Sequence, residues 1–244
     1  MPAPPQPRSI ARLATPWAVV GLVLIAAFGA YLRFGHAGPF ALDEWGHGVA
    51  TVSRGSAPHA IAVFMAEAGS GIGAAACTAI AAALLLALRR PRDAASVATA
   101  MLLGIAAAET SKALVLRPRP WEQLYHAAGS SYPSGHSMGA AALAVSLALV
   151  AAESRRLSRT ATRWAWAVAA AWIVTMMWSR TALHVHWLSD TVAGALLGIC
   201  AAVLARRLWE RAARPVSAVP PRRDAWARPA SSEPAGAATA AAPS

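Results

Sequence analysis

Six long apolar runs constrain this chain more than any other feature of its sequence. Hydrophobic residues make up 57% of the 244 residues, and they fall in continuous blocks rather than alternating with polar residues. An α-helix needs about 20 apolar residues to cross the hydrocarbon core of a bilayer, and each crossing segment must satisfy its own backbone hydrogen bonds. The blocks therefore predict an all-α integral membrane protein, a six-transmembrane-helix bundle with spans over about 17–32, 72–88, 94–116, 137–152, 164–178 and 187–205.

The basic residues are divided unevenly between the segments that connect these runs. The formal net charge is +11, and of the 22 basic residues all but one are arginine. They cluster in short groups between apolar blocks, a pattern that suits membrane topology and argues against nucleic acid as a partner. Six lie on one predicted side of the membrane and sixteen on the other, and the positive-inside rule places the larger group in the cytoplasm. This predicts a multi-pass protein of the cell (inner) membrane with both termini cytoplasmic. The loops that face the periplasm or the extracellular side then carry Arg33, Arg54, Lys112, Arg117, Arg119 and Arg180.

The chain divides into three predicted parts. Residues 1–15 form a cytoplasmic N-terminal segment, residues 16–211 a six-span domain, and residues 212–244, rich in Pro, Ala and Ser, a disordered cytoplasmic tail. A cleaved signal peptide is the competing interpretation of the first apolar run. Within the first outer loop, residues 35–69 are predicted to lie at the interface with one short helix over 59–68, and the adjacent acids Asp43 and Glu44 are expected to be solvated.

The apolar runs also contain small residues with a packing role. Gly194 and Gly198 form a small-xxx-small pattern in the last run, which favours close helix packing inside the bundle over a dimer face. A homodimer therefore stays only a possible assembly. Cys77 and Cys200 both lie in apolar runs, where buried, unreactive thiols are expected.

Charged residues gather at the outer end of the third predicted span. Lys112 lies near that end, and Arg119 follows in the sequence Arg117-Pro118-Arg119-Pro120. Charges near a membrane interior are costly and tend to be functional, although a single basic residue at a helix end often only reaches the interface. The grouping indicates phosphate binding, with Glu109 one turn before Lys112 and able to orient it.

The next outer loop leads into the fourth span through the sequence Pro133-Ser134-Gly135-His136. Ser134 is a good N-cap, and Gly135 allows a ligand to approach the backbone. Free amides at such a helix start favour an anion. The sequence predicts an anion-binding helix N-terminus with His136 beside it.

The last outer loop contains Arg180, His186 and Asp190 next to a strongly apolar run. Asp190 follows His186 by four residues, so on a shared helix the carboxylate would hold one ring N–H and leave the other nitrogen as a nucleophile. Arg180 would bind the oxyanion under attack. His184 and His186 also suggest a metal-binding His-x-His pair, but they point to different faces of a helix and no third ligand is evident.

Together these segments resemble the three signature motifs of the type 2 phosphatidic acid phosphatase family of membrane lipid phosphatases. The motifs read Lys112, six residues, Arg119-Pro120; then Pro133 to His136; then Ser179-Arg180, five residues, His186, three residues, Asp190. Every fixed position of the family pattern is present in order, and the likeness covers about 17–211.

The resemblance implies a role for each motif residue. His186 would attack phosphorus and form a phosphohistidine, with Asp190 holding its tautomer, and His136 would protonate the leaving group and then activate water. The phosphoryl oxygens would be bound by Lys112, Arg119, Arg180, Ser134 and the amide of Gly135. No metal and no cofactor is implied, because cations and amides supply the positive charge.

The implied partners are the bilayer and a lipid phosphate or diphosphate, of the undecaprenyl diphosphate, phosphatidylglycerol phosphate or phosphatidic acid type. Three alternatives remain open at this point: a lipid-linked phosphotransferase that uses the same site, a vanadium haloperoxidase, which the six spans disfavour, and a non-enzymatic transporter or scaffold.

Overall fold

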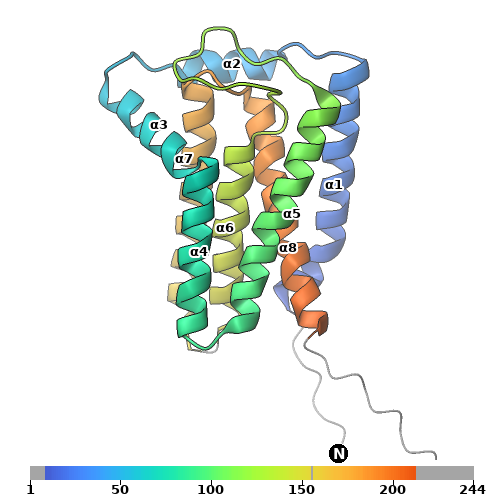
Figure 1. Cartoon of the computed structure of the whole chain (residues 1–244), viewed down its shortest axis with the longest axis vertical. Coiled ribbons are helices and arrows are strands. Elements are labelled where there is room, and N and C mark those ends of the chain that lie inside the picture. The colour runs from blue at the N-terminus through green and yellow to red at the C-terminus, as the bar shows by residue number, and fades with distance from the viewer. Residues whose placement is uncertain (1–8, 155, 213–244) are drawn as a thin grey trace, which may run out of the picture. The chain divides into compact units, whose positions relative to one another are not determined.

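The computed structural model describes residues 9–154 and 156–212, which form a bundle of α-helices with no strand in those ranges (Figure 1). Residues 1–8 and the predicted disordered tail beyond residue 212 lie outside this described part. The helices are α1 Ile10–Phe34, α2 Ala41–Ala50, α3 Ala57–Ala68, α4 Gly71–Ala87, α5 Pro91–Val115, α6 Gly135–Ala152, α7 Arg159–Ala182 and α8 Leu188–Ala212. The all-α prediction is therefore confirmed.

The helices of the structure confirm some, but not all, of the six predicted crossings. Each of the six predicted runs coincides with a helix, but four helices, α1, α5, α6 and α8, are long and apolar enough to cross a membrane by length and composition. The pair α3 and α4, bent by 65° at their junction, would make a fifth. α7 has 24 residues but carries Arg159, Arg163 and Arg180, which lower its mean hydropathy. The composition of the helices supports a multi-pass membrane protein.

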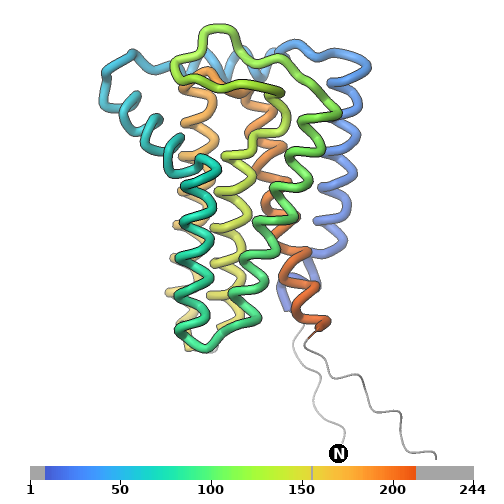
Figure 2. The backbone as a smooth tube through the Cα atoms, viewed as in Figure 1, coloured from blue at the N-terminus to red at the C-terminus, as the bar shows by residue number. Residues whose placement is uncertain are grey.

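The last helix, α8, packs against α6, α5, α1 and α7, and the tube view in Figure 2 shows it passing behind α5. Two glycines allow its close approach to α6. A Cβ on Gly194 would lie 2.3 Å from the Ser134 carbonyl oxygen, and one on Gly198 would lie 2.3 Å from that of Met138. The prediction that these glycines pack inside the bundle is confirmed.

We expect Gly198→Ala to lower the thermal unfolding midpoint of the detergent-solubilised protein by several degrees. The added methyl group meets backbone atoms that cannot move aside alone, and overpacking of this kind costs about 1–3 kcal/mol. Gly71→Ala is the matched control, because a Cβ there meets nothing within 4 Å. Equal midpoints for the two variants would show that the α6–α8 contact is looser than described.

The outer surface of the bundle is apolar in the way that a lipid-facing surface requires. Large exposed side chains include Trp17 on α1, Ile72 and Ile80 on α4, and Leu102 on α5. Soluble monomers rarely expose so much contiguous apolar surface. The prediction of two buried thiols is half right: Cys200 is buried, but Cys77 is exposed on α4 because that helix packs on the bundle through one face only.

One end of the bundle is covered by α2, α3 and the loop between α5 and α6, while the start of α1 and the end of α8 lie at the other end (Figure 1). The helix expected over 59–68 is confirmed as α3, which starts slightly earlier with Ser56 as its N-cap. The second short helix, α2, was not predicted. It brings residues 41–50 over the motif-bearing loops.

Candidate active site

The tight turn between α7 and α8 positions His186. α7 ends in a Schellman motif, with the amide of Val185 donating to the Arg180 carbonyl at 3.2 Å and that of His184 to Thr181 at 3.0 Å. α8 begins at Leu188, and the Asp190 carboxylate reaches back to accept from the amide of Trp187 at 3.0 Å, as in half of a capping box. His186 is therefore fixed between two helix ends.

The relation between His186 and Asp190 differs from the expected shared helix, because α8 starts only after His186. The two side chains still meet, with His186 Nδ1 3.9 Å from Asp190 Oδ2. The closer partner of Nδ1 is the carbonyl oxygen of Ser131 at 2.7 Å, and the Ser131 hydroxyl donates to Asp190. Because a carbonyl only accepts, Nδ1 carries the hydrogen and Nε2 keeps its lone pair.

Burial keeps the His186 ring neutral. The pKa of His186 is lowered to about 4, chiefly because the ring is desolvated, and the nearby cations Arg119 and Arg180 lower it further against the opposing effect of Asp190. Burial also lowers the pKa of Arg119. At neutral pH the Nε2 lone pair is therefore available to attack an electrophile.

We expect the His186 ring to titrate with a midpoint near pH 4 in the substrate-free protein. Burial disfavours the charged imidazolium, so protonation requires a pH well below the ordinary range of histidine. The measurement is NMR of ring-labelled histidines in detergent micelles, with the His186→Gln variant identifying the resonance. A midpoint at or above pH 6.5 would contradict this account of the site.

Arg119 and Arg180, both predicted to bind phosphate, differ in whether their N–H groups have hydrogen-bond partners. Arg119 donates to the carbonyl of Val185 at 2.6 Å and to those of Ala128 and Ser130, and its Nη1 lies 3.2 Å from His186 Nε2. Arg180 is 1% exposed, and its Nε and Nη1 have no hydrogen-bond partner among the described residues. Leaving charged donors buried and unpaired is costly, so an anion placed beside Arg180 would relieve that cost.

The start of α6 contributes a second positively polarised region. Ser134 is the N-cap of α6, as predicted, and accepts from the amide of Ser137 at 3.4 Å. A Cβ on Gly135 would lie 3.3 Å from Lys112 Nζ, so the ammonium group reaches the first turn of α6. The predicted pairing of Glu109 with Lys112 is confirmed at 2.7 Å.

His136 lies on this first turn of α6, close enough to Lys112, Arg180 and His186 for their charges to act on its ring. Its Nε2 is 3.1 Å from the carbonyl of Ala66, which requires a hydrogen on that nitrogen. Nδ1 is then the nitrogen that can exchange a proton with a bound ligand. The structure thus brings the predicted residues of all three motifs to one end of the bundle.

A sequence model of the PAP2 superfamily matches residues 93–214. The match covers half of the chain and all three motif segments. The chain belongs to the PAP2 superfamily. No curated protein sequence matches it significantly.

Two solved structures share this PAP2 fold. One is a transmembrane PAP2 type phosphatidylglycerolphosphate phosphatase from Bacillus subtilis, 21% identical, with a TM-score of 0.70 over 81% of this chain and 98% of that one. The other is LpxE from Aquifex aeolicus, 20% identical, with a TM-score of 0.57 over 69% of this chain and 96% of that one. At these identities the likeness concerns the fold.

A buried ion network links the PAP2 motifs to α2, and sequence reasoning missed it. Asp43 is fully buried and pairs with Arg117 at 2.8 Å, and Arg117 in turn pairs with Asp190 at 2.6 Å. The expectation that Asp43 is solvated is therefore wrong, although Glu44 is exposed. Asp43 also accepts from the amide and the hydroxyl of Ser189, so α2 holds the start of α8. The one signal in the sequence was an acidic residue on the same predicted side of the membrane as five arginines, with nothing to indicate which of them would pair with it.

Proposed function

We propose that this protein is a membrane lipid phosphatase that hydrolyses the terminal phosphate of a lipid phosphate or isoprenyl diphosphate through a phosphohistidine at His186. The observation that carries the proposal is Arg180, a buried guanidinium with unpaired N–H groups, within electrostatic reach of a neutral His186. A phosphoryl group supplies the missing acceptors, and its phosphorus is the electrophile that Nε2 requires.

In the first step, His186 Nε2 forms a bond to phosphorus as the bond from phosphorus to the leaving oxygen breaks. The bound phosphate dianion favours the doubly protonated His136 ring, which gives its Nδ1 proton to that oxygen, and the oxygen departs as part of the lipid alcohol or, from a diphosphate, of the lipid monophosphate. The negative charge that develops on the phosphoryl oxygens is stabilised by Arg180, Arg119, Lys112 and the amide of Gly135, with Ser134 as a further donor.

In the second step, water attacks the phosphohistidine. His136, now neutral at Nδ1, takes a proton from the water as the phosphorus–nitrogen bond breaks and inorganic phosphate forms. Asp190 keeps the turn that carries His186 in position during both steps, because its carboxylate accepts from the Ser131 hydroxyl and from the Trp187 amide. The protein's own cations supply the charge stabilisation, so the proposed hydrolysis is metal-independent.

The proposed topology has six crossings, with α7 as a span in spite of its arginines and α4 as the crossing half of the bent pair. Arg180 lies at the site end of α7, and Arg159 and Arg163 lie at its other end, so the middle of this helix is uncharged. The distribution of basic residues then places the site at the periplasmic or extracellular side with both termini in the cytoplasm.

A lipid substrate is favoured by two apolar cavities beside Tyr132, which follows the Ser131 that holds His186. One of about 310 Å³ lies between α1 and α5 and the other of about 270 Å³ between α1 and α8. An acyl or isoprenyl chain of the substrate would bind in one of these cavities as its phosphate reaches Arg180. The phosphatidylglycerolphosphate phosphatase fold of the neighbour supports the same class.

The test is phosphate release by the purified protein in detergent, with EDTA present, from phosphatidylglycerol phosphate, phosphatidic acid, undecaprenyl diphosphate and water-soluble glycerol phosphate. We expect at least one lipid to be hydrolysed with a kcat/KM well above that of glycerol phosphate. Phosphate transferred to an acceptor other than water would identify a phosphotransferase instead, and the absence of any reaction would refute the proposal.

We expect Arg180→Gln to reduce kcat/KM on the preferred lipid by about 100-fold or more, as the loss of a donor to a developing anion does in other enzymes. Arg54→Gln is the matched control, because that outer arginine is exposed and only touches the Gln123 carbonyl at 3.3 Å. Equal activity of the two variants would show that Arg180 does not bind the phosphoryl group.

A further inference from the structure

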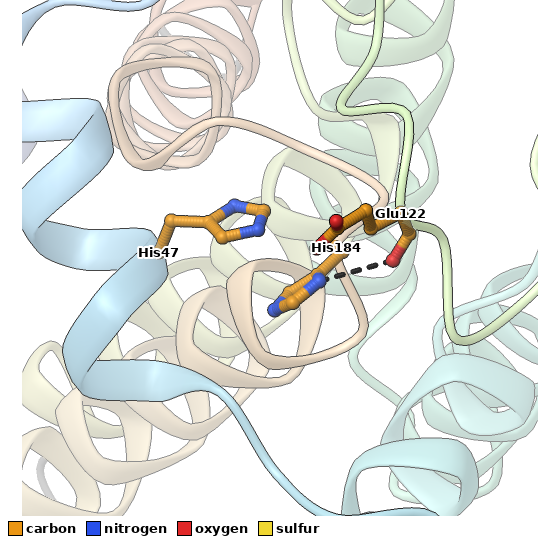
Figure 3. A group of neighbouring side chains, drawn as sticks. All are labelled: His47, Glu122 and His184. Atoms are coloured by element: carbon orange, nitrogen blue, oxygen red, sulfur yellow. Dashed lines mark hydrogen bonds between the residues drawn. The ribbon is translucent and has the colours of Figure 1, made fainter.

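Two histidines and a glutamate that the phosphatase mechanism does not use lie close together at the end of the bundle that carries the three motifs. His47 comes from α2, Glu122 from the loop after Arg119, and His184 from the turn that carries His186, and Figure 3 shows their side chains pointing toward one another. One ring nitrogen of each histidine and one carboxylate oxygen of Glu122 lie within 4.8 Å of one another. Sequence reasoning missed this group because it paired His184 with His186.

His184 occupies its position at a conformational cost. It is the residue after the C-cap of α7 in the Schellman motif, and its φ is +53°. Glycine is the usual residue there because a side chain disfavours the left-handed conformation. Arg89 and Leu116 share this conformation, and the feature that distinguishes His184 is the set of partners of its ring.

The His184 ring is oriented as a metal ligand usually is. Its Nδ1 lies 3.0 Å from the backbone carbonyl of Glu122, so Nδ1 carries the hydrogen. This leaves the lone pair on Nε2, which lies 2.9 Å from the Thr51 hydroxyl. An N–H of the ring bound to a carbonyl is the common way in which proteins fix the tautomer of a metal-ligating histidine.

His47 has an unused nitrogen beside that ring. Its Nδ1 is buried and has no hydrogen-bond partner among the described residues. The two ring centroids lie 3.6 Å apart, so two imidazolium charges would repel strongly. The neutral imidazole is the form that binds metals.

We propose that His47, His184 and Glu122 form a binding site for a divalent transition-metal ion, with zinc as the best fit. Two imidazole nitrogens and one carboxylate oxygen are three of the four ligands of a tetrahedral zinc site, and solvent or the neighbouring Glu44 completes it. Zinc bonds of 2.0–2.1 Å place tetrahedral ligand atoms about 3.4 Å apart, so the three atoms, which lie within 4.8 Å of one another, must close by up to about 1.4 Å. Rotation of the exposed Glu122 side chain and of the His47 ring would shorten these distances.

The site is open to solution and separate from the phosphoryl site. His47, Glu44 and Glu122 line a cavity of about 350 Å³ together with Pro120, Trp121 and Trp187. A bound ion would tie α2 to the two loops that carry Arg119 and His186. It would therefore stabilise the outer face of the protein without taking part in hydrolysis.

The experiment compares the thermal unfolding midpoint of chelator-treated, dialysed protein in detergent with and without added Zn²⁺. Bound ligand stabilises the folded state by mass action, and we expect the midpoint of the wild type to rise by several degrees at saturation. Co²⁺ in place of Zn²⁺ gives a second readout, the visible absorption of a tetrahedral histidine-ligated ion.

Three variants remove one ligand each: Glu122→Gln, His47→Gln and His184→Gly. Glu122 is exposed and glycine suits the backbone at position 184, so these two variants keep the fold. We expect each variant to need at least about tenfold more Zn²⁺ for the same shift of the midpoint. Even the loss of a residue that only holds a metal ligand in place lowers metal affinity by about tenfold or more. His126→Ala, an exposed histidine in the same loop as Glu122, should behave as the wild type. No shift with Zn²⁺, or a shift and a Co²⁺ spectrum unchanged in all three variants, would overturn the proposal whatever the result of the phosphatase assay.

Discussion

Replacement of His186 by glutamine is expected to reduce steady-state phosphate release by at least about 10⁴-fold, as the loss of a nucleophile does in enzymes with a covalent intermediate. Of the two ring nitrogens, Nε2 is the one that carries the lone pair, because Nδ1 donates to the Ser131 carbonyl. Glutamine retains an N–H for that carbonyl but offers no nucleophilic nitrogen. The measurement is initial-rate hydrolysis of the preferred lipid by both proteins.

The matched control for this variant is His184→Gly, which changes a histidine two residues away that the mechanism does not use. Its kcat should stay within about threefold of the wild type in the presence of EDTA. The thermal unfolding midpoint of His186→Gln must also stay near that of the wild type. A folded His186→Gln protein with substantial activity would remove His186 from the chemistry.

Asp43→Asn is expected to destabilise the protein by about 3 kcal/mol or more, the usual cost of breaking one partner of a buried ion pair. The Asp43 carboxylate accepts from four donors: Arg117 Nη2, the Ser189 amide, the Ser189 hydroxyl and the Phe40 amide. An asparagine NH₂ would face some of these donors with another donor. Arg117 would also lose half of the negative charge that its burial requires.

Activity should fall with stability in this variant, because Arg117 links Asp43 to Asp190. Glu44→Gln is the matched control, since the next carboxylate along α2 is exposed and makes none of these contacts. The measurements are the thermal unfolding midpoint and kcat/KM of the two variants, both without added metal. If Asp43→Asn matches Glu44→Gln in both quantities, the buried network does not hold the site.

Local features of this protein could be predicted from its sequence because they depend on neighbours along the chain. The N-cap of α6 at Ser134, the pair of Glu109 and Lys112, and the packing role of Gly194 and Gly198 all follow from helical spacing. The gathering of the three motifs at one end could be expected too, because antiparallel helices return each second loop to the same side.

Contacts made by the 35–69 segment could not be predicted in this way. The sequence gives no register for a loop that folds back over a bundle, so neither the burial of Asp43 nor the approach of His47 to His184 could be expected. The start of α8 was placed one residue too early for a similar reason. The Asp190 carboxylate accepts from the Trp187 amide and so fixes the start of the helix there, which leaves His186 outside the helix.

The most direct test of the proposed chemistry is to trap the phosphoryl-enzyme. Purified protein would be mixed with excess lipid substrate, quenched at alkaline pH within the first turnover, where phosphohistidine is stable, and digested for mass spectrometry. The account predicts a phosphoryl group on His186 and none in the His186→Gln protein. Steady phosphate release with no phosphoryl-enzyme, or with the phosphoryl group on His136 or His184, would contradict it.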